Sequence, residues 1–279
     1  MQTAPNSATA NLPRPVTPLG IAVNHLEIAI ALLAHAAIPS EAAHHLQKAF
    51  ELMAGLDPYL EQTATPASSA LADIAERTRH EPWQAKFDEG ETVRPLEQEM
   101  LSGHIEGQTL KLFVHMIRAR RILDIGMFTG YSALAMAEAL PADGSLIACE
   151  VDPYAASFAQ SLFQKSPHGS KIQVDLGPAL ETLNRLAAQG EPFDFVFIDA
   201  DKQEYVQYYQ TLMDSGLLSD QGYICVDNTL FQGQVYLPEA ERSASASAIA
   251  QFNQVVAADP RVEQVILPLR DGLTLIRRV

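Results

Sequence analysis

Two short acidic segments carry side chains that could bind a divalent cation. The segment DADK (199–202) follows one apolar run, and DN (227–228) follows another. If the two runs are neighbouring parallel strands, the oxygens of Asp199, Asp227 and Asn228 meet at one edge of the sheet. Carboxylate and carboxamide oxygens suit Mg²⁺, or another hard cation such as Mn²⁺ or Ca²⁺. The spacing therefore predicts a metal site at this edge.

Lys202 lies beside the predicted metal site. An ammonium held near a metal and a ligand can serve as a general base if its pKa is lowered. A surface salt bridge explains the same spacing equally well. We therefore treat Lys202 as the candidate catalytic residue and keep the salt bridge as the alternative.

A glycine-containing turn follows the first predicted strand. In DIGMFTGYS (124–132), Gly126 and Gly130 allow a tight turn and the close approach of a ligand to the backbone. Phe128 and Tyr131 stand where a dinucleotide fingerprint has its second and third glycines. The turn favours a nucleoside ligand without a pyrophosphate, and a nicotinamide dehydrogenase remains the remote alternative.

Glu150 ends the second predicted strand, about 20 residues after Gly130, where an acidic side chain can accept both hydroxyls of a ribose. A carboxylate at a strand end can instead cap the following helix. Asp152, directly before Pro153, is better placed for that capping role. Glu150 is therefore predicted to be free for a ligand.

Seven short apolar runs indicate the sheet that must position these side chains. Five of them alternate with helical stretches, which predicts parallel strands covered on both faces by helices. The last two flank Asp271-Gly272 and predict an antiparallel hairpin. The runs are RILDI, SLIACEV, KIQVDL, FDFVFID, GYICVD, VEQVILP and LTLIRRV. The expected fold is a seven-stranded, doubly wound, Rossmann-like α/β sheet with a helical extension at its amino-terminal end.

The chain before residue 92 has a different pattern. Residues 1–17 are expected to form a flexible leader, and residues 18–91 an Ala-rich extension of three or four short helices. The best bounded helix runs from Ser40 to Ala54, with Ser40 as its N-cap and Gly55 as its stop.

The remaining domain, residues 92–279, is expected to open with two helices split near Ser102-Gly103. The second of these helices should bury four apolar side chains, namely Ile105, Leu112, Val114 and Ile117.

Composition excludes several function classes. With 19 basic and 34 acidic side chains, the 279-residue chain has a net charge of −15. A field of that sign repels phosphate backbones, so nucleic acid is not an expected partner and a tRNA methyltransferase is disfavoured. The most apolar window, residues 20–38, is interrupted by polar side chains, and no secretory signal is visible. We expect a cytoplasmic protein without membrane contact.

Several segments, in order, resemble the metal-dependent class I S-adenosylmethionine O-methyltransferases of the caffeoyl-CoA and catechol type. They span about Met100 to Val279 and read EMLSGHIEGQTL, DIGMFTGYSALAMAEALP, GPALETL, FIDADKQEY, VDNTLFQGQV and ADPRVEQVILPLRDGLTL. The resemblance implies S-adenosylmethionine and a divalent metal as cofactors, with Asp199, Asp227 and Asn228 as metal ligands and Lys202 as the catalytic lysine.

The resemblance also assigns further contacts. Gln232 is similar in place to a substrate-contacting Asn, and Asp124 stands where Glu is commoner in the family. The implied cofactor contacts are Met100, Ser102, Asp124, Gly126, Ser132, Glu150, Ala179, Asp201 and Tyr208.

The long amino-terminal part, with GLDPYLEQ and GETVRPLEQEMLSGH, resembles one branch of the family. That branch methylates demethyl-4-deoxygadusol to 4-deoxygadusol in mycosporine-like amino acid biosynthesis. Catechols and flavonoids present the same vicinal oxygens as this enediol and remain alternatives. Coenzyme A esters are less favoured, because the stretch beyond Gln232 offers only Arg242 before Arg261. The family also implies a homodimer, in which the helical extension could act as a dimerisation arm or a substrate lid.

Overall fold

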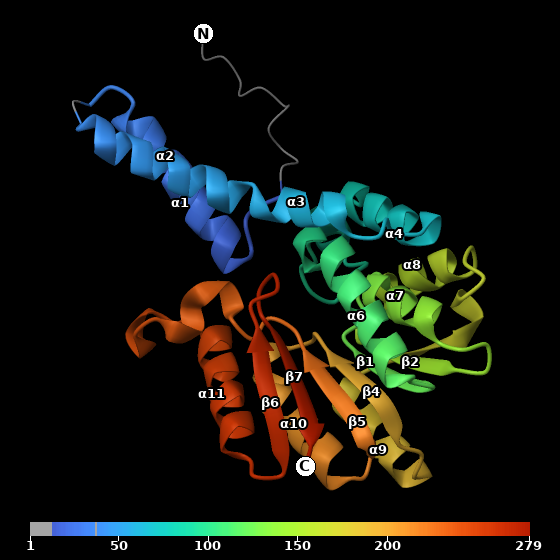
Figure 1. Ribbon diagram of the computed structural model, residues 1–279. Coiled ribbons are helices and arrows are strands. Elements are labelled where there is room, and N and C mark those ends of the chain that lie inside the picture. Colours follow the sequence, from blue (N-terminus) through green and yellow to red (C-terminus); the bar gives the residue numbers. More distant parts are fainter. Residues whose placement is uncertain (1–12, 37) are drawn as a thin grey trace.

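The computed structural model describes residues 13–36 and 38–279, and its centre is a seven-stranded sheet with helices on both faces (Figure 1). The strand order is β3-β2-β1-β4-β5-β7-β6, with β1 to β5 parallel and β7 antiparallel to both of its neighbours. The strands are β1 Arg121–Ile125, β2 Ser145–Glu150, β3 Ile172–Leu176, β4 Phe193–Ile198, β5 Leu218–Val226, β6 Val262–Leu267 and β7 Leu273–Arg278. The predicted doubly wound sheet with a C-terminal hairpin is confirmed.

In residues 13–36 and 38–279, sixteen helical elements accompany these strands. The α-helices are α1 Pro18–Leu33, α2 Ser40–Ala54, α3 Leu56–Thr63, α4 Ser69–His80, α5 Trp83–Asp88, α6 Gly103–Ile117, α7 Tyr131–Ala139, α8 Pro153–Phe163, α9 Ala179–Gln189, α10 Tyr205–Asp214 and α11 Ala244–Ala258. The 3₁₀ turns are η1 Gln98–Met100, η2 Gly169–Lys171, η3 Lys202–Glu204, η4 Phe231–Tyr236 and η5 Glu239–Glu241.

The two faces of the sheet carry separate hydrophobic cores, because successive strand residues point to opposite sides. Phe195 and Phe197 of β4 pack on one face, against α4, α6, α7 and α8. Val196 and Ile198 pack on the other face, against α9, α10 and α11. The site must therefore lie at a sheet edge, since both faces are filled with side chains.

The site lies at the carboxyl ends of β1 and β4, the neighbouring parallel strands where the order of strand addition changes direction. Such a switch point opens a crevice at the carboxyl ends of the strands. Gly126 follows β1 there with φ +97°, and an added Cβ would lie 2.1 Å from the Asp199 carbonyl oxygen. Only glycine allows the loops after these two strands to pass so closely.

The helical extension differs in part from the prediction. It holds five helices, α1 to α5, rather than three or four. The helix Ser40–Ala54 is confirmed, but Pro39 occupies the N-cap position and Ser40 is the first helical residue. Gly55 is right-handed (φ −81°) instead of left-handed, because α3 begins immediately after it.

Two predictions for the segment before β1 are wrong. The first of its two expected helices is only the 3₁₀ turn η1, and the preceding backbone is held instead by Asp152, which accepts from the Val93 amide at 2.7 Å. Leu112 is 51% exposed. Leu110 and Val114, one helical turn apart, face the core, so Leu112 between them faces outward.

The predicted leader lies mostly outside the described residues, which begin at residue 13. Arg14 donates its backbone amide to the Glu99 carboxylate at 3.1 Å, and Thr17 caps α1 through Gly20. The helices α1 and α2 project from the body as a hairpin (blue in Figure 1). Within the described chain, no helix has the length and apolar character needed to cross a membrane.

Candidate functional site

A cleft of about 390 Å³ at the carboxyl edge of the sheet collects most of the predicted site residues. Its walls come from the segment before α1, the turn after β1, the ends of β2, β4 and β5, and the turn between β6 and β7. The predicted residues that line it are Met100, Ser102, Gly126, Glu150, Asp199, Asp201, Lys202, Asp227, Asn228 and Gln232. Folding therefore brings together positions that lie up to 132 residues apart in the chain, from Met100 to Gln232.

Four predicted cofactor contacts do not line this cleft in the part of the chain that the structure describes. Asp124 and Ser132 are buried under the glycine turn, where the Ser132 hydroxyl donates to Asp124 Oδ2 at 2.8 Å. Ala179 begins α9 and packs against the core on that face. Tyr208 is 2% exposed, and its hydroxyl donates to Glu204. Their cofactor roles stay predictions.

Asp124 has one oxygen that the protein leaves without a partner. Its Oδ1 is buried and has no hydrogen bond among the described residues. Burial in this apolar setting raises the pKa of Asp124 to about 7, against the hydrogen bond from Ser132. An acceptor oriented beneath the turn suits a polar ligand or water at the glycine turn.

Backbone ladders extend past β4 and β5 and place the acidic side chains together. The Asp199 amide donates to Ile125 O at 2.9 Å, and the Asp227 amide to Ile198 O at 3.0 Å. Asp227 is 5% exposed, and its pKa is raised to about 7 by burial and by the charge of Asp199. The cleft thus concentrates negative charge at adjacent strand ends.

Lys202 forms a largely buried pair with Asp199, Nζ to Oδ1 at 2.7 Å, and lies over the ring of Tyr205. Burial works against the ammonium, but the charge of Asp199, its hydrogen bond and the contact with Tyr205 together outweigh burial and raise the pKa of Lys202. The prediction that Lys202 has a lowered pKa, as a general base requires, is therefore wrong for this arrangement. The salt bridge named as the alternative is present, but it does not lie at the surface, because both side chains are less than one-fifth exposed.

The donor set at this edge fits a hard divalent cation. In the described chain, no three His, Cys, Asp or Glu side chains come together closely enough to hold a metal. A third ligand would have to be the carboxamide of Asn228. Its Nδ2 donates to Asp271 Oδ2 at 3.3 Å, which leaves Oδ1 for a cation beside Asp199 and Asp227.

Backbone amides hold both oxygens of Glu150, and its predicted contact with a ligand stays a prediction. Its Oε2 accepts from the Phe128 amide at 2.7 Å, and its Oε1 accepts from the amides of Val151 and Asp152 at 2.9 Å. Burial raises its pKa against these bonds. Asp152 caps α8 as predicted. Glu150 therefore fixes the glycine turn to β2 and still lines the cleft.

Sequence reasoning missed a group of charged residues in and around the cleft. Arg14, Arg94, Arg270 and Asp271 all line it. Arg270 Nε lies 3.4 Å from Oε2 of Glu106, a fully buried carboxyl whose pKa is raised well above its usual value by burial. The only sequence signal was the Asp-Gly hairpin turn, which says nothing about what the turn faces.

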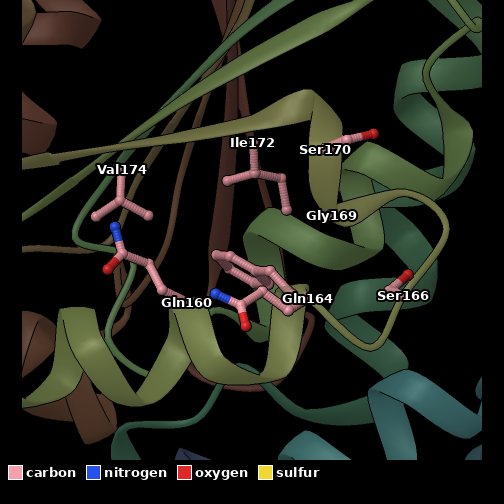
Figure 2. A pocket seen from close by; sticks show the side chains of 8 residues that line it. Gln160, Gln164, Ser166, Gly169, Ser170, Ile172 and Val174 are labelled. Atoms are coloured by element: carbon pink, nitrogen blue, oxygen red, sulfur yellow. The ribbon is translucent and has the colours of Figure 1, made fainter.

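A second hollow, of about 510 Å³, lies between α8 and β3 (Figure 2). Glutamine and serine side chains and the aliphatic residues Ile172 and Val174 surround it, and none of its described lining residues is charged. Its described lining offers no group for acid–base or metal chemistry.

The chain matches known proteins along most of its length. The family model described as O-methyltransferase matches residues 79–279. A caffeoyl-CoA O-methyltransferase of Petroselinum crispum is 34% identical over 75% of this chain and 84% of that protein. The SAH-bound methyltransferase PaMTH1 of Podospora anserina has a TM-score of 0.69 and 28% identity, covering 82% and 96% of the two chains.

A third similar protein is the O-methyltransferase TomG of Streptomyces achromogenes, involved in tomaymycin synthesis and solved with SAM. Its TM-score is 0.69 and its identity 27%, over 81% of this chain and 96% of that chain.

Proposed function

This chain belongs to the O-methyltransferase family and is an S-adenosylmethionine-dependent O-methyltransferase, and we propose that it methylates one of two vicinal oxygens on a small ring substrate. The carrying observation is the set of oxygens from Asp199, Asp227 and Asn228 at adjacent strand ends in one cleft with Lys202. A cation held there by three protein oxygens would have coordination positions left for two neighbouring substrate oxygens.

The cofactor would occupy the side of the cleft formed by the glycine turn. When bound, S-adenosylmethionine supplies an electrophilic methyl carbon on a sulfonium sulfur. We assign the ribose to Glu150 and the neighbouring backbone approach to Gly126, both of which line the cleft. Met100, Ser102 and Asp201 line the same cleft and would contact the methionine end.

The metal side is formed by Asp199, Asp227 and Asn228. A divalent cation bound there supplies Lewis acidity that lowers the pKa of an acceptor hydroxyl. Asp227 and Asn228 hold a fixed position because the loop that carries them is hydrogen-bonded to β4 and to Asp271.

Lys202 would act on the acceptor oxygen. Because its pKa is raised, Lys202 holds a proton at Nζ and stabilises negative charge on that oxygen, and it becomes a base only if its pair with Asp199 is broken. The acceptor hydroxyl, with its pKa lowered by the cation, would release its proton to solvent, and Lys202 would stabilise the resulting oxyanion. Bound S-adenosylmethionine would supply the methyl group for this oxygen and leave as S-adenosylhomocysteine. Gln232, in a left-handed conformation (φ 56°), would contact the acceptor ring.

For the acceptor itself we propose demethyl-4-deoxygadusol, supported by the resemblance to the branch with a long amino-terminal part. A caffeoyl-type acceptor is the second candidate, and one structural observation favours it. The cleft gathers Arg14, Arg94 and Arg270, none of which lies in the stretch between Gln232 and Arg261. These arginines come from other segments and weaken the argument against coenzyme A esters, although Arg14 pairs with Glu97 and Arg270 pairs with Glu106.

The test is mass spectrometry of products from a panel of acceptors incubated with enzyme, S-adenosylmethionine and Mg²⁺. The panel contains demethyl-4-deoxygadusol, simple catechols, a flavonoid and caffeoyl-CoA. The proposal is supported if demethyl-4-deoxygadusol gives a product 14 mass units heavier and is methylated faster than the other acceptors. Full turnover in excess chelator would contradict the metal assignment. Titration with NADH against S-adenosylhomocysteine tests the dehydrogenase alternative.

We also propose that the chain acts as a homodimer through its helical hairpin. The helices α1, α2 and α3 contain no buried residue, and Ile28, Leu32 and Leu52 are 49–77% exposed. Exposed apolar helix faces of this extent are typical of interaction surfaces. Light scattering after gel filtration should give twice the 30.4 kDa chain mass; a monomer would refute the proposal.

A further inference from the structure

The turn between β6 and β7 lies against the loop that follows β5, and Asp271 is the centre of this contact. Asp271 is 6% exposed. Its Oδ1 accepts the Gln232 amide, and its Oδ2 accepts from Asn228 Nδ2 at 3.3 Å. One carboxylate therefore binds both ends of the loop that carries a proposed metal ligand and a proposed substrate contact.

Backbone groups of the same turn complete the contact. The Thr229 amide donates to Gly272 O at 3.1 Å, and the Leu230 amide donates to Asp271 O at 2.8 Å. Gly272 has φ +91°, and an added Cβ would lie 2.7 Å from the Leu230 nitrogen. The turn and the loop are therefore in direct backbone contact. This contact fixes the position of Asp271 next to Asn228.

A carboxylate has a particular effect on Asn228 at this distance. Ionised Asp271 can only accept hydrogen bonds, so Asn228 must direct its amide nitrogen towards it. The carbonyl oxygen of Asn228 then points away from Asp271. Only that oxygen can bind a hard cation, because the amide nitrogen has no lone pair to donate.

We propose that Asp271 is a positioning residue that fixes the orientation of the Asn228 carboxamide and thereby sets the affinity of the cleft for a divalent cation. The inference rests on the proposed metal site and adds a residue behind it. Carboxylates that orient metal ligands in this way contribute about 10- to 100-fold to metal affinity.

The position of Asp271 does not depend on its own side-chain bonds alone. Its neighbour Arg270 donates from Nη2 to Leu101 O at 3.3 Å and pairs with the buried Glu106. These contacts anchor the turn to α6 and to the segment that precedes it. A substitution of Asp271 should therefore leave the turn in place and affect mainly what the carboxylate holds.

The sharpest variant is Asp271→Asn, which keeps the shape and removes one acceptor. Asn has a single acceptor oxygen, whereas the Gln232 amide and Asn228 Nδ2 both need one. If the oxygen serves Gln232, the new amide faces the amide of Asn228, which must rotate its nitrogen towards the cation. We expect Mn²⁺ binding to S-adenosylhomocysteine-saturated protein, measured by electron paramagnetic resonance, to weaken by about tenfold or more.

The matched control is Asn253→Ala. Asn253 Nδ2 donates to Thr229 O at 2.8 Å, so it holds the same loop without touching Asn228. If Asp271 only stiffened the loop, both variants would weaken Mn²⁺ binding alike. We expect Asn253→Ala to keep Mn²⁺ affinity within about twofold of the parent, and S-adenosylhomocysteine affinity to stay unchanged in both variants.

A compensating change tests orientation directly. In the double variant Asp271→Asn with Asn228→Asp, the new amide donates to a carboxylate that needs no particular rotation, so Mn²⁺ affinity should recover by about fivefold or more over Asp271→Asn.

Two results would overturn the inference while leaving the metal site intact. One is unchanged Mn²⁺ affinity in Asp271→Asn together with weakened affinity in Asn228→Ala. The other is a loss of fold in Asp271→Asn, judged by circular dichroism, that the double variant does not reverse, because Asp271 would then have a structural role only. If Asn228→Ala and the parent protein bind Mn²⁺ equally or not at all, the metal proposal itself fails, and this inference fails with it.

Discussion

The helices α1 and α7 are both rich in apolar residues, yet α7 is buried and α1 is not. Seven residues of α7, from Tyr131 to Ala137, are buried, whereas α1 has no buried residue along its 16 positions. Helix α7 follows the glycine turn and packs between the sheet and α6. Helix α1 contacts mainly α2 and, at one end, η4. Burial is therefore decided by the neighbours that the topology supplies, and not by composition alone.

The same contrast distinguishes the cleft from the helical hairpin α1–α2, which we call the arm. At the carboxyl ends of the strands, burial raises the pKa of Asp124 and Asp227. The pKa of Lys202 is raised there against burial, by Asp199 and Tyr205. The arm carries its polar residues, such as His44 and His45, in exposed positions. Changes at the sheet edge should therefore alter activity, and changes in the arm should alter assembly.

The largest effect is expected for Asp227→Ala. Loss of a proposed metal ligand should lower kcat by about 10³-fold or more, while far-UV circular dichroism stays unchanged because a buried charge is removed rather than created. Methyl transfer is measured by mass spectrometry with the preferred acceptor. The control variant in the arm, Glu27→Ala, should leave kcat unchanged. An equal loss of kcat in both variants would contradict the claim that activity depends on the cleft and not on the arm.

Lys202→Met should lower kcat by about 10²- to 10⁴-fold at saturating S-adenosylmethionine, because the acceptor oxyanion loses its ammonium partner. The control is Lys86→Met, which removes an ammonium that lies 3.1 Å from Glu91, away from the metal side of the cleft. An unchanged rate in Lys202→Met would show that the lysine only neutralises Asp199.

The variant Asp124→Asn tests whether the buried carboxyl near the cleft makes the unfolding free energy depend on pH. The native chain keeps a proton on Asp124 up to a pKa of about 7, whereas the unfolded chain loses it near 3.8. The unfolding free energy of the parent should therefore fall as pH rises from about 4 to 7. The variant should lack this loss, up to about 4 kcal/mol at pH 8. Urea denaturation at pH 5 and pH 8 measures it, and parallel pH profiles would refute it.

The smallest effect is expected in the arm. Leu134→Ala in α7, fully buried, should lower the unfolding free energy by about 3 kcal/mol because it leaves a cavity. Leu32→Ala in α1, 77% exposed, should cost less than about 0.5 kcal/mol when measured on dilute monomer. If Leu32→Ala costs as much as Leu134→Ala at low protein concentration, α1 is buried within its own chain and the contrast is wrong.

The local sequence pattern was sufficient to predict the strands of the sheet and the acidic residues that follow β4 and β5. Each strand matches an apolar run within a few residues, because a parallel strand buried on both faces needs consecutive apolar side chains. Leu112 shows the limit of such reasoning. It belongs to an apolar helix face by composition, but the register of α6 directs it to solvent.

The sequence by itself determined the alternation of strands and helices and which oxygens follow β4 and β5, since both depend on local periodicity. Only the tertiary structure decided that Lys202 pairs with Asp199, that Glu150 is held by backbone amides, and that the turn at Asp271 faces Asn228. Charge, burial and hydrogen-bond partners depend on residues distant in the chain, and their positions relative to one another exist only after strands and turns have packed.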